Sequence, residues 1–221
     1  MFTRTSRAAV LALGALLVCG LLRAQVFIPA SESVGPPPDA PGTGLNGYYF
    51  FVDKEFQGTI VTNANAAAIA MGTPTATFQA TFLNYGNSPD LISVHDFLNS
   101  NFQTDGDTLN PLITDPVATS VFDFKGYISI PDASVTYTFA LNSDDGSLLT
   151  IGQSALTVVD NDGDHAGQEK QMDVDFEAPG LYPVEVLFYN DNFQGGTGGQ
   201  ILQVKLFGGI IDTGMLYPAV P

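Results

Sequence analysis

The sequence predicts an all-β domain, an antiparallel β-sandwich with one or two short helices. From about residue 45 onward, apolar and polar side chains mostly alternate with a period of two, which is typical of half-buried strands. These short segments are separated by Gly, Asn, Asp and Pro, which favours a sandwich or barrel over an α/β fold. A domain of roughly 150 residues can bury about 68–70% of its unfolded surface, so one core is sufficient.

The first segment, residues 1–24, is predicted to be a secretory signal peptide. Arg4 and Arg7 precede an apolar run from Ala8 to Leu22, and Ala24 ends a small-residue cleavage site. The run is too short for a transmembrane helix, which needs about 20 apolar residues, and Val18 before Cys19 disfavours a lipoprotein. We therefore expect a protein that is secreted, extracellular or at the cell surface, without membrane insertion.

Residues 25–44 are rich in Pro and Gly, and we expect them to form an extended linker that buries no core. The predicted sandwich then spans residues 45–207, and residues 208–221 form a C-terminal tail. The expected strands are Leu45–Val52, Ala76–Leu83, Val121–Ile130, Ser134–Leu141, Leu148–Ile151, Ala155–Asp160, Gln171–Glu177, Leu181–Tyr189 and Gln200–Phe207. The expected helices are Asn63–Met71 and Leu91–Leu98.

Charge narrows the classes of ligand. The chain has a formal net charge of −16, and removal of the signal peptide would leave four lysines against 23 acidic residues. Such a surface repels phosphate backbones and anionic lipids, so nucleic acid is not an expected partner. Cys19, the only cysteine, lies in the signal, so the mature chain has neither a disulfide nor thiol chemistry.

Asp144-Asp145-Gly146-Ser147 is the most informative motif. It lies between two apolar segments, where we expect the mouth of a hairpin. Adjacent carboxylates repel each other, and Ca²⁺, which prefers several oxygen ligands, would remove that repulsion. Asp and Gly are also common in ordinary hairpin turns, so the motif alone allows both a calcium site and a plain turn.

Further segments follow this motif in a recognisable order. They are Val158-Val159-Asp160-Asn161 with Gly163 and His165, then Ala178-Pro179-Gly180-Leu181-Tyr182-Pro183, and finally Gln194-Gly195-Gly196-Thr197-Gly198-Gly199 before the last strand. Together with the opening segment Gly44-Leu45-Asn46-Gly47-Tyr48-Tyr49, this set resembles the PA-fourteen domain, the protective-antigen-type β-sandwich of bacterial toxins, glycosidases and adhesins. The resemblance covers about residues 45–207.

The resemblance implies a calcium-dependent lectin or adhesin. In lectin-like members of the family the paired aspartates are joined by a cis peptide bond, which here would link Asp144 and Asp145. Those members complete the ion's ligands from the glycine-rich loop, which implies the side chains of Asn192 and Gln194 and the backbone of Gly195 and Gly196. Open positions on Ca²⁺ then accept sugar hydroxyls, so Asp144, Asp145 and Gln194 would form the carbohydrate-binding set, and glycans or polysaccharide would be the partners.

Other constellations are weaker. Residues 160–165 are rich in aspartate but fail as an EF-hand, because His165 stands where Gly is required; an acidic turn in a β-meander and a second ion site both stay open. His95 and His165 lack a nucleophile motif, and we expect His165 to pack near the paired aspartates.

Three functions follow from these observations. We expect a secreted Ca²⁺-dependent carbohydrate-binding domain and no enzyme activity, so no catalytic residues. The alternative is a structural cell-envelope or matrix module with at most a stabilising calcium and no sugar site. A polysaccharide-active enzyme using two carboxylates is the third interpretation.

Overall fold

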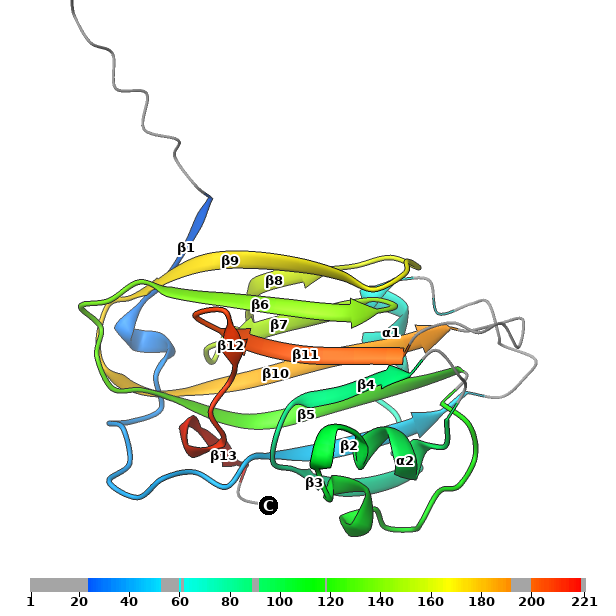
Figure 1. The fold of residues 1–221 in the computed structure, drawn as a ribbon. Coiled ribbons are helices and arrows are strands. Elements are labelled where there is room, and N and C mark those ends of the chain that lie inside the picture. The colour runs from blue at the N-terminus through cyan, green and yellow to red at the C-terminus, as the bar shows by residue number, and fades with distance from the viewer. Residues whose placement is uncertain are drawn as a thin grey trace, which may run out of the picture.

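Two antiparallel-rich sheets pack face to face in the computed structural model, which describes residues 24–52, 60, 62–88, 92–117, 119–191 and 200–219 (Figure 1). The six-stranded sheet contains β1 (Gln25–Ile28), β9 (Gln168–Phe176), β6 (Tyr137–Asp144), β11 (Gln200–Leu206), β12 (Gly209–Ile210) and β4 (Asn84–Ser88). The seven-stranded sheet contains β3 (Ala76–Ala80), β2 (Leu45–Phe51), β5 (Thr119–Ile130), β10 (Gly180–Asp191), β7 (Ser147–Ile151), β8 (Leu156–Asn161) and β13 (Leu216–Pro218). The predicted β-sandwich is confirmed.

The period-two pattern places the core between the sheets. On β11, Leu202 and Val204 are buried against the other sheet, while Gln203 and Lys205, each of which follows one of them in the sequence, are half-exposed. All nine strands expected from the sequence are present, with ends that differ by a few residues. The missed strands β1, β4, β12 and β13 are short, and a two- to five-residue segment carries too little alternation to be recognised.

The long strands β5 and β10 form the centre of the seven-stranded sheet. They pair antiparallel over twelve positions, from Thr119 opposite Asp191 at one end to Ile130 opposite Gly180 at the other. Their inward-facing aromatic side chains, including Phe122, form the middle of the core. These strands therefore set the length of the sandwich and define its two ends.

Two short α-helices lie outside the sheets, as expected. Helix α1 (Asn63–Ala70) begins at Thr62, whose hydroxyl accepts a hydrogen bond from the backbone of Asn65. It covers one end of the outer face of the seven-stranded sheet, where Ala66 packs with Leu187 and Tyr189 in a second apolar cluster. Helix α2 (Val94–Leu98) inserts its aromatic side chain into the main core.

The remaining helical pieces are single 3-10 turns, and one of them orders the N-terminal segment. They are η1 (Ala30–Glu32), η3 (Ser100–Phe102), η4 (Asp105–Thr108) and η5 (Thr213–Met215). The Glu32 carboxylate accepts hydrogen bonds from the backbone and hydroxyl of Ser154, so η1 is tied to the loop after β7. In the described part of the chain, no helix has the length and apolar character needed to cross a membrane.

The expected linker and tail are in fact parts of the sandwich. Strand β1 pairs in parallel with β9, and Ile28 is fully buried. Further on, the backbone of Gly44 donates to Leu216 in β13, which itself pairs with β5, while β12 pairs with β11. The boundaries at residues 25–44 and 208–221 were wrong in this respect, because the pairing partners lie far away in the sequence and leave no local signal.

Candidate functional site

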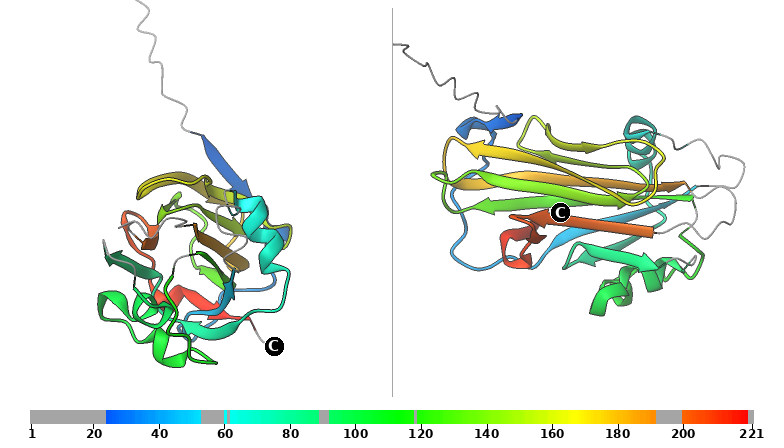
Figure 2. Two further views of the ribbon diagram at one scale, coloured as in Figure 1. Left: turned by 90° about the vertical axis from the view of Figure 1, so that its right-hand side faces the viewer. Right: turned by 45° about the horizontal axis from the view of Figure 1, so that its top comes forward.

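Two connections between the sheets meet at the end of the sandwich where β5 begins and β10 ends. One leads from β6 to β7 and the other from β8 to β9, and each passes from one sheet to the other. The arrowheads of β6 and β10 point to this end (Figure 1), and α1 lies beside it (Figure 2). The Asp144–Gly146 segment is therefore a crossover between sheets and not the mouth of a hairpin, and residues 162–167 are a second crossover and not a turn in a meander.

The first crossover carries the predicted pair of aspartates, and the peptide bond between Asp144 and Asp145 is cis, as the resemblance implied. Asp144 Oδ2 accepts a hydrogen bond from the backbone N–H of Gly167 at 3.1 Å. Asp145 is 6% exposed; its Oδ1 accepts from the backbone of His165 at 3.0 Å and its Oδ2 from that of Asp191 at 2.8 Å. Backbone groups of the second crossover and of the end of β10 thus hold the pair in place.

Gly146 is required at the next position. Its carbonyl accepts a hydrogen bond from the backbone of Tyr189 at 3.0 Å, and a Cβ added to it would lie 2.4 Å from the Tyr189 ring. Any side chain at residue 146 would push the crossover away from β10. The glycine therefore lets the Asp145 carboxylate reach the end of β10.

The electrostatics of this end disfavour negative charge. Burial raises the pKa of Asp145 to about 7; the neighbouring Asp164 carboxylate acts in the same direction, and the backbone donors of Asp191 and His165 oppose it. Burial also raises the pKa of Asp144. Burial raises the pKa of the Tyr189 phenol, and the negative charge of Asp162 adds a smaller increase. A cation beside these groups would offset the cost of their charge.

The second crossover is used mainly to hold α1 and the aspartate pair. Asp162 Oδ1 accepts hydrogen bonds from the backbones of Asn63 and Gly163, and Asp160 accepts from the Asn63 side chain at 2.9 Å. His165 lies next to the pair, as expected. Two carboxylates of residues 160–165 thus serve the start of a helix, where negative charge is favourable, and the segment that carries them is a crossover and not the expected turn of a meander.

A buried polar layer lies beneath the crossovers, and the sequence did not reveal it. The Ser143 and Ser147 hydroxyls are 2.7 Å apart, and the Asn161 side chain donates to Ser143 at 2.9 Å. Ser120 and Gln200 are fully buried, yet among the residues that the structure describes neither the Ser120 hydroxyl nor either polar atom of the Gln200 amide has a hydrogen-bond partner. All of these residues occupy inward-facing positions at strand ends, and the other inward-facing residues of the same strands are mostly apolar. The polar layer is therefore recognisable only once the structure shows that these strand ends meet.

The donor set fits Ca²⁺ in part. Two carboxylates on one crossover and buried amide groups nearby are oxygen donors of the kind that Ca²⁺ prefers, and the ion requires 6–8 oxygens. Within the described residues, no group of three or more His, Cys, Asp or Glu side chains is placed to hold a metal. Further ligands must come from elsewhere, and the predicted ligands Asn192, Gln194, Gly195 and Gly196 lie outside the described residues.

The remaining candidate residues have structural contacts. His95 lies 3.3 Å from Asp96 and 3.2 Å from Asp107, both carboxylates. Asp105 is almost fully buried and accepts hydrogen bonds from Tyr85 and Thr81. These groups position α2 and η4 on the sandwich.

Comparisons with known proteins agree on one family and fold. The PA14 domain family model matches residues 74–210. A PA14 domain of the MpAFP antifreeze protein aligns with TM-score 0.64 at 21% identity, covering 83% of this chain and 95% of that one. A PA14 sugar-binding domain from an RTX adhesin aligns with TM-score 0.60 at 22% identity, covering 75% and 89%.

A third similar structure is also an adhesin domain. The epithelial adhesin 6 A domain from Candida glabrata, in complex with Galβ1-3GlcNAc, aligns with TM-score 0.52 at 16% identity, covering 86% of this chain and 93% of that one. At these identities the likeness establishes the fold. A search of curated proteins gave no match.

Proposed function

Because the chain belongs to the PA14 domain family, we propose that it is a secreted, non-enzymatic carbohydrate-binding domain of the lectin or adhesin type. The observation that carries this proposal is the carboxylate pair Asp144 and Asp145, held at one end of the sandwich by backbone donors from the second crossover and from the end of β10. The sugar-binding adhesin domains of similar fold support the same class of ligand.

Several residues at this end of the sandwich would contribute to the proposed site. Asp144 and Asp145 would hold Ca²⁺, with the side chains of Asn192 and Gln194 and the backbone of Gly195 and Gly196 completing the set. The ion would supply coordination positions that sugar hydroxyls can fill. Asp145 accepts from His165 and Asp191, so both of its oxygens keep a fixed direction before any ligand arrives.

The partner would be a neutral glycan outside the cell. A formal net charge of −16 repels anionic polysaccharides. Affinity per site would be weak, as for most small polar ligands, so useful binding would depend on several copies or several sugars.

Calorimetry with Ca²⁺ tests the metal site. We expect the wild-type chain to bind Ca²⁺, and Asp144→Ala and Asp145→Ala to bind at least tenfold more weakly, because each removes a carboxylate. Asp39→Ala, which removes an exposed carboxylate elsewhere, should bind as the wild type does. Unchanged binding by Asp144→Ala would refute the assignment.

A glycan array tests the sugar site. We expect binding in millimolar Ca²⁺ that disappears in chelator and in Asp144→Ala. One second function is favoured by the hydrogen bonds of Asp145, which join the first crossover to the second crossover and to the end of β10: a structural module with a stabilising ion. That alternative predicts a lower melting temperature in chelator but no glycan binding in either condition.

A further inference from the structure

A row of polar side chains crosses the outer face of the seven-stranded sheet, away from the Asp144–Asp145 end. Five residues on five neighbouring strands lie in register: Gln79, Asn46, Lys125, Glu185 and Thr150, on β3, β2, β5, β10 and β7. They alternate with core residues of the same strands, so they face outward. Four steps of about 4.8 Å between strands make the row about 19 Å long.

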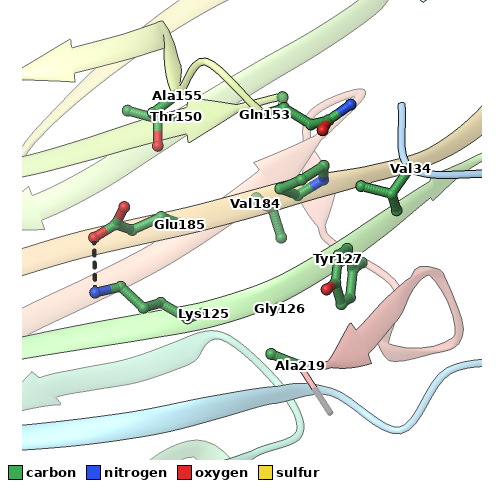
Figure 3. A pocket seen from close by; sticks show the side chains of 12 residues that line it. Val34, Lys125, Gly126, Tyr127, Thr150, Gln153, Ala155, Val184, Glu185 and Ala219 are labelled. Atoms are coloured by element: carbon green, nitrogen blue, oxygen red, sulfur yellow. Dashed lines mark ion pairs between the residues drawn. The ribbon is translucent and has the colours of Figure 1, made fainter. Parts of the chain in front are cut away.

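The surface along this row is hollowed. One hollow of about 450 Å³ is bordered by Lys125, Tyr127, Thr150 and Glu185 (Figure 3). A second, of about 790 Å³, is bordered by Asn46, Tyr48 and Gln79. Ala219 borders both hollows, so they adjoin at that residue. We call the two together the sheet-face groove.

Internal contacts hold the polar groups of the groove in position. Lys125 Nζ lies 2.5 Å from Asp123 Oδ2 and 3.3 Å from Glu185 Oε1, and the second of these ion pairs is drawn in Figure 3. The Asn46 side chain donates to the Ala219 carbonyl at 2.9 Å. The side chains of Lys125 and Glu185 remain 43% and 36% exposed, so they can contact a ligand without first being reordered.

The chemistry of the groove selects among ligands. Amide, ammonium, carboxylate and hydroxyl groups alternate along the row, and they suit a ligand whose hydroxyls both donate and accept hydrogen bonds. Tyr48 and Tyr127 add aromatic rings beside the row. Charged Lys and Glu are depleted from the centres of protein interfaces, which disfavours a protein partner, and the negative net charge disfavours anionic chains.

We propose that the sheet-face groove is a second carbohydrate-binding site, which binds a linear neutral polysaccharide without a metal ion. The length of the row suits several consecutive sugars and not a single terminal one. This site lies on a different surface from the crossovers, and its function is independent of the function proposed for them.

Affinity electrophoresis in the presence of chelator tests this site. The full chain is run through native gels containing mixed-linkage β-glucan or galactomannan, with EDTA throughout. We expect retardation of the wild type by at least one of them, a loss of tenfold or more in affinity for Tyr127→Ala, and a smaller loss for Gln79→Ala. Gln171→Ala, which removes an exposed glutamine on the six-stranded sheet, should be retarded like the wild type.

Several outcomes would overturn the proposal. One is no retardation of the wild type by either polysaccharide; another is equal loss in Gln171→Ala. Melting temperatures confirm that each variant is folded, and sedimentation gives its oligomeric state. A wild-type dimer that Tyr127→Ala disperses, without retardation by polysaccharide, would assign this face to a second copy of the chain. Because EDTA removes any bound metal ion from every sample, these gels report on the groove alone, and failure of the groove is distinguishable from failure of the metal site, which calorimetry with Ca²⁺ tests.

Discussion

The two ends of the sandwich interior are built differently. At the end opposite the crossovers, which we call the closed end, Tyr137, Phe176 and Tyr182 form an aromatic cluster. The ring centroid of Phe176 lies 5.4 Å from that of Tyr137 and 4.9 Å from that of Tyr182. Both tyrosine hydroxyls donate to backbone carbonyls, of Asp132 and Ala178. At the crossover end, inward-facing positions carry the polar groups of Ser120 and Gln200, which have no hydrogen-bond partner within the described part of the chain, and the nearby Asp145 carboxylate is buried.

This difference separates stability from function in one fold. The closed end buries large apolar area with every polar atom of its tyrosines paired, so it contributes free energy of unfolding. The crossover end buries charge and unpaired polar atoms, which costs free energy unless a ligand satisfies them. Groups retained at such a cost are expected where a binding site is preorganised.

The largest expected effect breaks the closed end. Phe176→Ala removes a buried ring that contacts Tyr137 and Tyr182, and it should lower the free energy of unfolding by about 3–5 kcal/mol. Chemical denaturation in chelator measures this loss, with Phe27→Ala, whose side chain is 59% exposed, as the control. Equal losses in the two variants would show that the aromatic cluster is not a main source of stability.

The second prediction concerns Asp123, a buried carboxylate on β5 that has a cationic partner, Lys125. Burial raises the pKa of Asp123 to about 7 from 3.8; the Lys125 ammonium lowers it and Glu185 raises it. The folded state therefore keeps a proton that the unfolded state has lost. The free energy of unfolding should fall as pH rises from about 4 to 7 and then level off.

Asp123→Asn removes this titrating carboxyl group and so isolates its contribution to the pH dependence of stability. Its stability relative to the wild type should grow between pH 4 and 7, by an amount on the order of a few kcal/mol, and stay constant above pH 7. Urea denaturation at pH 4, 5.5, 7 and 8 measures the difference, with the exposed Asp39→Asn as the control. A difference that is flat across this range would contradict the raised pKa.

Local pattern was sufficient for most of the fold but not for the placement of the sheets. Alternation identified β11, where buried and half-exposed residues alternate throughout, and the halves of β5 and β10 that keep the same pattern, whereas consecutive residues are buried in the other halves. It could not show that β6 and β7 belong to different sheets, since a hairpin and a crossover leave the same apolar run on either side of a turn. The parallel pairing of β1 with β9 joins segments far apart in the sequence and was missed for the same reason.

The candidate site divides in a similar way. Resemblance predicted the cis bond at Asp144–Asp145, and composition drew attention to the aspartates. The backbone donors of Gly167 and Asp191 were not predictable, because a backbone N–H carries no residue signature. Gln200 was not recognised either, since one amide at the start of a strand is common.

The third prediction tests whether the first crossover needs its glycine. Gly146→Ala places a methyl group against the Tyr189 ring and should cost about 1–3 kcal/mol of stability through overpacking. It should also weaken Ca²⁺ binding, because the Asp145 carboxylate would be displaced. Calorimetry and denaturation are compared with Gly35→Ala, where an added Cβ meets no atom within 4 Å. Wild-type stability and binding would show that the crossover tolerates displacement.

The smallest expected effect on stability tests the crossover end. In chelator, Gln200→Met should raise the free energy of unfolding by about 1–2 kcal/mol, because it replaces a buried amide that has no hydrogen-bond partner with an apolar chain of similar length. Gln203→Met, three residues along β11, should instead lose about 1 kcal/mol, because its amide bonds Asn84 and Asn142. If Gln200→Met were also destabilising, the polar layer would already be satisfied within the protein, and the crossover end would not differ from the closed end in the way described.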